Sequence, residues 1–318
     1  MRRRVRAGLI NTTVFGVLFL SATGCAGHAA APVVAPIAAV ADATGLTGVG
    51  MVSAGSRPLP AANAAGVLRL SLTVGGLKRG YLLAPARKKA PRMRPALLLY
   101  LPSANTLLGD EYVRYGLDLL RDHGMTVVVA GPWAGSWNAG RCCGQAHQRR
   151  VDDVAAVSAM RDDALRIAGA DPARVVVLGH SAGALMAWRL ACDGAFGAAA
   201  VVAVAGTLVS SCPALPSVPA FLAVNGGRDT SIPLEGSTRV VPLLGIAPPS
   251  VRKSLAVLAL AGGCQESSVS SGLSDVHGCR GANPLQLRVL ENAGHSWAGL
   301  DGTRAASLFL HAHVAGID

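Results

Sequence analysis

The sequence predicts an α/β protein with a mostly parallel, doubly wound sheet that helices cover on both faces. Several short segments are apolar at every position, which is typical of strands buried on both faces of a parallel sheet. Stretches with a helical spacing of apolar residues separate these segments, and glycine or proline often marks the change. Strands and helices that alternate in this way indicate an α/β fold, and no internal repeat is visible.

The predicted elements begin with a hairpin. Residues 67–74 and 81–84 are expected to pair antiparallel and to turn at Gly75 and Gly76. The buried strands are expected at residues 96–101, 125–130, 174–178, 198–205, 220–224 and 285–290. The helices are expected at residues 110–123, 151–168, 182–192, 251–261 and 303–314. Because helices link most of these strands, the strands are expected to run parallel within one sheet.

The composition is that of a folded globular domain. The chain has 318 residues, of which 51% are hydrophobic and 15% are charged, and its formal net charge is +11. Four of the 29 lysines and arginines lie within the first six residues, and no run of five or more basic residues occurs. Nucleic acid is therefore not expected as a partner.

The first 25 residues resemble a bacterial export signal. A positively charged start precedes an apolar stretch at residues 9–20, which is too short to span a bilayer comfortably. Residues 22–25 read Ala-Thr-Gly-Cys and are similar to a lipobox, so Cys25 is the predicted site of lipidation and of membrane attachment. The predicted protein is a cell-envelope lipoprotein on the periplasmic or cell-surface side. The alternative is ordinary signal cleavage before or at Ala31, which gives a secreted protein.

The composition changes after residue 65. Residues 26–65 consist almost entirely of Ala, Pro, Gly, Val, Ser and Thr, with almost no charge and no periodicity, and are predicted to form a tether. Residues 66–318 are predicted to form the one large folded domain. No other stretch reaches transmembrane length without a glycine, a proline or a charge.

The cysteines suit disulfides in an exported protein. Six remain beside Cys25, and six cysteines allow fifteen pairings. Proximity in the sequence favours Cys264 with Cys279 and Cys192 with Cys212. The adjacent Cys142 and Cys143 either form a vicinal pair or bind the other cysteines. No C-x-x-C pattern occurs, so no metal site is expected.

A nucleophile elbow follows the strand at residues 174–178. Residues 179–183 read Gly-His-Ser-Ala-Gly and precede the helix at residues 182–192, which is the strand–turn–helix context that the G-x-S-x-G pattern requires. The flanking glycines allow a turn so tight that a side chain would clash there. The turn presents the Ser181 hydroxyl at the end of the sheet and directs the helix N-terminus at a developing oxyanion.

An acid and a base follow two later strands in the order that this kind of site requires. Asp229 comes after the strand at residues 220–224, and His295 comes after the strand at residues 285–290. They are the predicted orienting acid and general base for the Ser181 nucleophile, because a serine hydroxyl reacts poorly until a base removes its proton. The alternatives for the acid are Asp275 and Glu235. The competing histidines are His123, His180, His311 and His313, none of which follows a strand with an acid upstream.

Seven segments together resemble the secreted poly(3-hydroxybutyrate) depolymerase and feruloyl esterase family of α/β-hydrolases. They occur in family order at residues 137–144, 151–154, 171–175, 179–183, 190–192, 226–229 and 294–297. The resemblance spans nearly all of residues 66–318 and implies an α/β-hydrolase fold. It also implies a serine esterase for esters of hydroxy acids or aromatic acids, and it gives Ser181, Asp229 and His295 the roles stated above.

The sequence departs from that family where the oxyanion hole is built. The family has His-Gly after its third strand, whereas this chain has Pro102 and Ser103. Proline has no N–H, so the second oxyanion donor is expected from Ser103 or Ala104, beside the N–H of Ala182. The family's proline after Gly-His-Ser-Trp is replaced by Ala298.

Three tryptophans, Trp133, Trp137 and Trp297, lie on loops near the expected mouth of the site. They either line a pocket for an acyl chain or an aromatic ring, or pack beneath the loops. Both interpretations remain open at this point.

These observations predict an exported serine esterase that forms an acyl-enzyme and needs no cofactor. The expected substrate is a small or oligomeric ester, because no additional polymer-binding domain is evident. One alternative is an envelope acyltransferase that uses the same triad. The other is a catalytically silent binding lipoprotein, which only the change to Pro102 and Ser103 favours. The sequence does not predict the oligomeric state.

Overall fold

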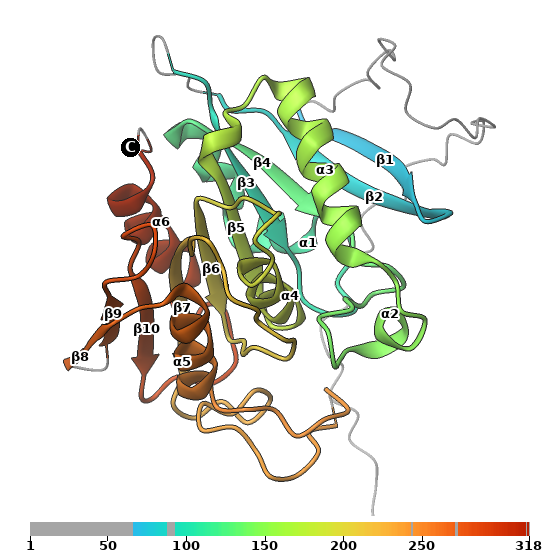
Figure 1. Cartoon of the computed structure of the whole chain (residues 1–318). Helices are drawn as coiled ribbons and strands as arrows, with labels where there is room; N and C mark the ends of the chain where they lie inside the picture. Colours follow the sequence, from blue (N-terminus) through green and yellow to red (C-terminus); the bar gives the residue numbers. More distant parts are fainter. Residues whose placement is uncertain (1–65, 88–92, 243, 271–272, 316, 318) are drawn as a thin grey trace, which may run out of the picture. The chain divides into compact units, whose positions relative to one another are not determined.

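A mixed sheet of ten strands organises the part of the chain that the structure describes (Figure 1). The computed structural model describes residues 66–87, 93–242, 244–270, 273–315 and 317. The predicted signal segment, lipidation at Cys25 and the tether at residues 26–65 lie outside the described residues. Within the described residues, no helix combines the length and the apolar character that crossing a membrane requires.

The strands lie in the order β1-β2-β4-β3-β5-β6-β7-β10-β9-β8. Their bounds are Leu68–Val74 (β1), Leu77–Ala84 (β2), Ala96–Leu101 (β3), Met125–Ala130 (β4), Val175–His180 (β5), Ala200–Val204 (β6), Ala220–Gly226 (β7), Glu266–Ser270 (β8), Leu273–His277 (β9) and Leu285–Leu290 (β10). The six central strands, from β4 to β10 in this order, run parallel. The two strands at each edge pair antiparallel. The carboxyl ends of the parallel strands therefore lie together at one end of the sheet, where open α/β sheets bind ligands.

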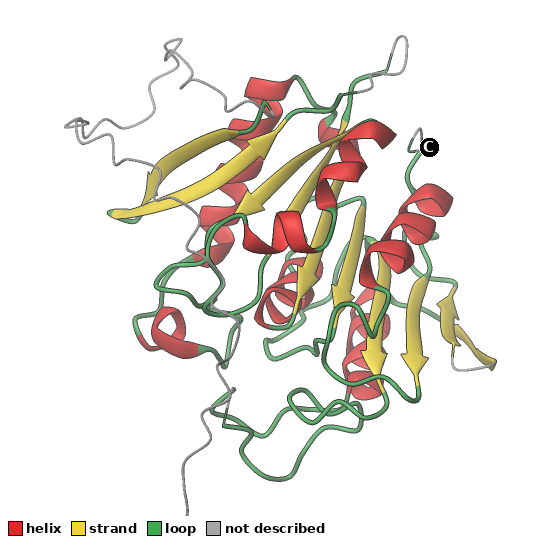
Figure 2. Ribbon diagram, turned by 180° about the vertical axis from the view of Figure 1, so that it is seen from behind, coloured by secondary structure: helices red, strands yellow, loops and turns green. Residues whose placement is uncertain are grey.

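Helices cover both faces of the sheet (Figure 2). The helices are α1 (Asp110–Arg114), α2 (Gly144–Gln148), α3 (Asp153–Ala168), α4 (Ala182–Ala191), α5 (Val251–Gly262), α6 (Gly302–His313) and the 3₁₀ segments η1 (Leu117–His123) and η2 (Pro172–Arg174). Apolar residues of α3, α4 and α5 pack on one face, and those of η1 and α6 pack on the other. The predicted fold class is therefore confirmed.

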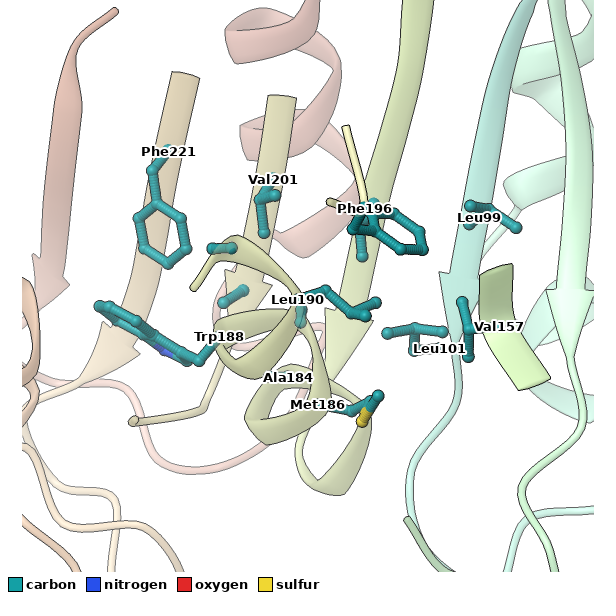
Figure 3. Packing of buried hydrophobic residues seen from close by; sticks show 14 of the residues in the cluster. Leu99, Leu101, Val157, Ala184, Met186, Trp188, Leu190, Phe196, Val201 and Phe221 are labelled. Carbon is teal, nitrogen blue, oxygen red and sulfur yellow. The ribbon is translucent and has the colours of Figure 1, made fainter. Parts of the chain in front are cut away.

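The alternation along β3 shows why a continuous apolar run makes a central strand. Leu97, Leu99 and Leu101 contact the α3 and α4 side, while Leu98 and Tyr100 contact the opposite side, and all five are fully buried. Figure 3 shows the first of these layers, where side chains of α4 fill the space in front of the sheet. A strand with helices on both sides has no solvent face, so neither set of positions is polar.

Several elements differ from the sequence prediction, among them the short helix α2, which was not predicted. The helix expected at residues 110–123 divides into α1 and η1, because Gly116 takes φ 64° between them, a left-handed conformation that ends a helix. The antiparallel strands β8 and β9 were not predicted. Their serine-rich sequences lack the apolar run or the strict alternation that indicates a strand.

Three disulfides connect the six cysteines after residue 66. Cys192 bonds to Cys212, and Cys264 bonds to Cys279, which are the pairs that proximity favours. Cys142 and Cys143 form the vicinal pair, which decides between the two alternatives for these residues. Disulfides of this number are typical of proteins in oxidising compartments.

A buried ion pair connects β2 to the start of α3. Nη2 of Arg79 lies 2.6 Å from Oδ1 of Asp153, and both side chains are at most 2% exposed. The other oxygen, Oδ2, accepts a hydrogen bond from the backbone N–H of Asn138 at 2.6 Å. The pair therefore holds the loop that contains Trp137, whose role at the site is described below.

Candidate active site

Ser181 lies in the turn between β5 and α4 in a conformation that only a tightly packed turn maintains. Its φ is 54° and its ψ is −119°, which is unusual for a residue with a side chain. A Cβ on Gly183 would come within 1.9 Å of the carbonyl oxygen of Leu101, and one on Gly179 within 2.3 Å of that of Gly183. These glycines let β5, α4 and the end of β3 approach closely, so that the serine lies at the end of the sheet.

The structure brings Ser181, His295 and Asp229 together from the ends of β5, β10 and β7. Nε2 of His295 lies 2.9 Å from Oγ of Ser181, and Nδ1 of His295 lies 2.7 Å from Oδ2 of Asp229. Asp229 precedes His295 by 66 positions in the chain, and Ser181 precedes it by 114. They are neighbours only because the parallel strands that precede them end at the same end of the sheet.

Asp229 orients the histidine ring and determines which of its two nitrogens carries the hydrogen. Its side chain is fully buried, and its Oδ1 accepts hydrogen bonds from the N–H groups of Ser231 at 2.8 Å and Ile232 at 2.9 Å. Two amide donors compensate the buried carboxylate, which leaves Oδ2 for His295. A carboxylate only accepts hydrogen bonds, so Nδ1 donates, and Nε2 of the neutral ring accepts from the Ser181 hydroxyl.

The alternative acids and the competing histidines lie outside the hydrogen-bonded chain of Ser181, His295 and Asp229. Glu235 is exposed and pairs with Arg252 at 3.3 Å, and Oδ2 of Asp275 accepts from Gln286 at 3.2 Å. His123 ends η1, and His311 and His313 lie in the last turn of α6. His180 is buried beside the site, and its Nε2 lies 3.3 Å from the carbonyl oxygen of His295.

Two backbone amides near Ser181 have no hydrogen-bond partner within the described residues. Ala182 begins α4, so its N–H has no partner in the helix. Of the two predicted second donors, the N–H of Ser103 donates to Oε2 of Glu111 at 3.0 Å. Ala104 is the other, and its N–H has no hydrogen-bond partner within the described part of the chain. Of the two predicted second donors, Ala104 is therefore the one whose N–H is left without a partner in the described residues.

Trp137 is not among the residues that line the cavity described below, and of its two interpretations the structure agrees with packing beneath the loops. Its side chain is fully buried in the core, and its indole N–H donates to the carbonyl oxygen of Pro102 at 2.9 Å. The guanidinium carbon of Arg79 lies 5.8 Å from the centre of the Trp137 ring. The tryptophan therefore supports the loop after β3 from beneath.

Trp297 does border a cavity of about 850 Å³ beside His295. The remaining lining residues are Arg114, Tyr115, Gly116, His180, Ser296, Ala298, Asp301, Gly302 and Thr303. The ring of Trp297 stacks on Tyr115 with a centroid distance of 4.6 Å, and its N–H donates to Thr303 Oγ1 at 3.1 Å. The cavity borders His295 and His180, and Ser181 is not among its lining residues.

Sequence reasoning missed Glu111. Its carboxylate is 4% exposed and accepts from the hydroxyl of Tyr100 at 2.7 Å as well as from Ser103. Burial raises the pKa of Glu111, but hydrogen bonds from His180, Tyr100 and Ser103 outweigh burial and lower it to about 2. No motif surrounds Glu111, and only the fold reveals that it lies against the elbow.

The described residues include no group of three or more His, Cys, Asp or Glu side chains that could hold a metal ion. His295 and Asp229 bind each other, and the six cysteines considered above are in disulfides.

Comparison with known proteins places the fold. No family model matches the chain, and a search of curated proteins finds no match. Among solved structures, acetyl xylan esterase from Aspergillus awamori has a TM-score of 0.53 at 14% identity, covering 76% of this chain and 98% of that chain. Thermogutta terrifontis esterase 2 phosphonylated by cyclosarin has a TM-score of 0.53 at 15% identity, covering 80% and 97%. The chain has the α/β-hydrolase fold.

Proposed function

We propose that the protein is an exported serine esterase that hydrolyses carboxylic esters through an acyl-enzyme on Ser181. The observation that carries the proposal is the continuous chain of hydrogen bonds from Asp229 through His295 to Ser181. A hydroxyl is a weak nucleophile, and an oriented imidazole within hydrogen-bond distance is the group that activates it. The triad on an α/β-hydrolase fold therefore supports acyl transfer.

The reaction begins when Oγ of Ser181 attacks the ester carbonyl and its proton passes to Nε2 of His295. Asp229 keeps the ring oriented and stabilises the positive charge that forms. The imidazolium then protonates the leaving alcohol, and the acyl group remains on Ser181. In the second half, His295 takes a proton from water, which attacks the acyl-enzyme and releases the acid.

The oxyanion in both halves is stabilised by the N–H groups of Ala182 and Ala104. Such donors act on charge that develops only in the transition state, and loss of one costs about 10²–10³ in rate. The silent-lipoprotein alternative relied on the absence of a donor at Pro102 and Ser103. An amide at Ala104 removes that support.

The substrate class comes from the family resemblance. The motif set similar to poly(3-hydroxybutyrate) depolymerases and feruloyl esterases favours esters of hydroxy acids or of aromatic acids. The two structural neighbours reported above, whose names describe esterases, agree with ester chemistry in general. Three disulfides and the signal-like first 25 residues favour export, with lipidation at Cys25 as the proposed anchor.

Hydrolysis of p-nitrophenyl butyrate by the purified protein, compared with its Ser181→Ala variant, tests the proposal. We expect the variant to lose several orders of magnitude in kcat/KM, because Ser181 is the group that carries the acyl chain in the proposed mechanism. Equal rates for the two proteins would overturn the proposal. Added alcohol acceptors separate hydrolysis from the acyltransferase alternative, since a transferase gives more transfer product than free acid.

A further inference from the structure

The buried carboxylate of Glu111 connects the loop after β3 to the nucleophile elbow. Its Oε2 accepts from both the Tyr100 hydroxyl and the Ser103 N–H, at 2.7 and 3.0 Å. Its Oε1 lies 3.8 Å from Nδ1 of His180, the residue that precedes Ser181. Oγ of Ser103 lies 2.8 Å from the same nitrogen. One side chain in the short helix α1 therefore holds two segments of the site.

The peptide unit between Pro102 and Ser103 is held at both ends. Its carbonyl oxygen accepts from the indole N–H of Trp137 at 2.9 Å, and its N–H donates to Glu111 at 3.0 Å. A peptide unit is planar, so bonds to its C=O and its N–H fix its rotation about the chain direction. The next amide, that of Ala104, follows this plane through φ and ψ of Ser103 only, so holding the plane limits where the Ala104 N–H can point.

The neighbouring amides confirm which one is left for a ligand. The N–H of Ser103 is engaged by Glu111, and the N–H of Asn105 donates to the carbonyl oxygen of Gly135 at 2.8 Å. We propose that Glu111 is a positioning residue that locks the Pro102–Ser103 peptide and thereby directs the Ala104 N–H to the oxyanion. This inference rests on the proposed esterase function.

The chemistry of the cluster indicates that Glu111 acts through the length of its side chain and not through its charge. Tyr115 and Thr106 contribute hydroxyl groups to Oε1, at 3.4 and 3.5 Å, so hydroxyl and amide donors surround the carboxylate together with Nδ1 of His180. Within the described residues, no lysine or arginine pairs with it. A buried carboxylate without a cation is costly unless its hydrogen bonds are made, and here they are made by the segments of the site.

Two substitutions separate reach from charge. Glu111→Gln keeps the length of the side chain, and its carbonyl oxygen can accept from both Tyr100 and Ser103 while its NH₂ faces hydroxyl groups that can rotate. Glu111→Asp keeps the charge but is one methylene shorter, so it loses the Ser103 N–H. We expect kcat on p-nitrophenyl butyrate to fall less than tenfold in the Gln variant and about tenfold to a hundredfold in the Asp variant, with KM within threefold.

A second substrate reports on the oxyanion hydrogen bonds directly. In the thiono analogue of the same ester, sulfur replaces the carbonyl oxygen and accepts hydrogen bonds only weakly. An enzyme with well-placed oxyanion donors prefers the oxygen ester, so the oxo-to-thiono ratio of kcat/KM measures their placement. We expect this ratio to fall at least tenfold in the Asp variant and to stay within threefold of wild type in the Gln variant. A general loss of stability lowers both rates and leaves the ratio unchanged.

The matched control is Asp163→Asn, because Asp163 also accepts from a tyrosine hydroxyl, that of Tyr81, but lies in α3 away from Ser181. We expect wild-type kcat and oxo-to-thiono ratio for this variant. An Asp variant that matches or exceeds the Gln variant in kcat, or one that keeps the wild-type ratio, would overturn the role of Glu111. Equal activity of wild type and Ser181→Ala would instead remove the esterase function itself, so the two failures are distinguishable.

Discussion

Asp229 determines which nitrogen of His295 carries the proton. Its buried carboxylate accepts from Nδ1 and from two backbone amides, so the ring presents an unprotonated Nε2 to Ser181. The distances of 2.7 and 2.9 Å leave little room for another arrangement. At the scale of single residues, the site therefore depends on the direction of these hydrogen bonds as well as on the serine itself.

Asp229→Asn tests this direction. The asparagine amide can donate toward Nδ1, which favours the tautomer with a proton on Nε2 and removes the base. We expect kcat to fall by about 10⁴ with little change in the free energy of unfolding. Glu235→Gln, at the exposed alternative acid, serves as the control and should leave kcat on p-nitrophenyl butyrate unchanged. A mild effect of Asp229→Asn would contradict the assignment.

Glu111 predicts a pH dependence of stability. Its pKa of about 2 lies below the ordinary 4.5, so its contribution is complete above pH 4.5 and is lost as the pH falls toward 2. We expect the free energy of unfolding to fall by about 2 kcal/mol more in wild type than in Glu111→Gln between pH 5.5 and pH 3. Urea titrations at the two pH values measure the difference. Parallel pH profiles for the two proteins would show that the carboxylate is not held as described.

At the scale of elements, the elbow depends on the close contact of two backbones, those of α4 and β3. Gly183 in α4 faces the carbonyl oxygen of Leu101 at the end of β3, where a Cβ would come within 1.9 Å. Neither backbone can retreat without moving the loop that carries the oxyanion amides. The short approach therefore links stability to activity at this position.

Gly183→Ala should lower both the stability and the activity of the protein. We expect unfolding to become easier by about 3 kcal/mol or more, because overpacking against backbone leaves no flexible side chain to move. Activity should fall at least a hundredfold, since a displaced β3 end misplaces one oxyanion donor. Gly80→Ala is the matched control, because the nearest atom to its Cβ would be 3.8 Å away. Thermal unfolding and kcat of both variants test the pair, and a stable, active Gly183→Ala protein would contradict the packing.

The elements show where sequence reasoning succeeds and where it stops. The parallel strands and the elbow were predictable, because a fully apolar run and a G-x-S-x-G turn are local patterns. The break in the helix expected at residues 110–123 depends on Gly116 adopting a positive φ, which the sequence permits but does not require. The choice between Ser103 and Ala104 depended on Glu111, whose side chain reaches the loop only in the folded chain.

At the scale of the whole molecule, the parallel sheet places residues from three distant segments at one edge. Asp229 and His295 were predictable because each follows an apolar strand in the order that the fold requires. The environment of Trp137 could not be predicted, because a tryptophan on a loop carries no signal that it points inward. The edge strands β8 and β9 were missed because polar sequences form strands only when a neighbour offers a free edge.

Two disulfides fasten loops of this domain. Cys264–Cys279 closes a loop of 15 residues and Cys192–Cys212 one of 20, so each should contribute about 3 kcal/mol. We expect the double variant Cys264→Ala/Cys279→Ala to lower Tm by about 10 °C. The variant Cys192→Ala/Cys212→Ala should show a similar decrease, because loop length enters only logarithmically. A decrease below 2 °C in both would show that the bonds do not constrain the unfolded chain.

The central claim is that Ser181 becomes acylated. Mass spectrometry of the intact protein after treatment with an alkyl fluorophosphonate tests it most directly, because the reagent stops at the phosphonyl-enzyme. We expect one adduct per chain, mapped by peptide analysis to Ser181, with no adduct on Ser181→Ala and much slower labelling of His295→Ala. An unlabelled protein that still hydrolyses p-nitrophenyl butyrate, or an adduct at another residue with full activity in Ser181→Ala, would contradict the account.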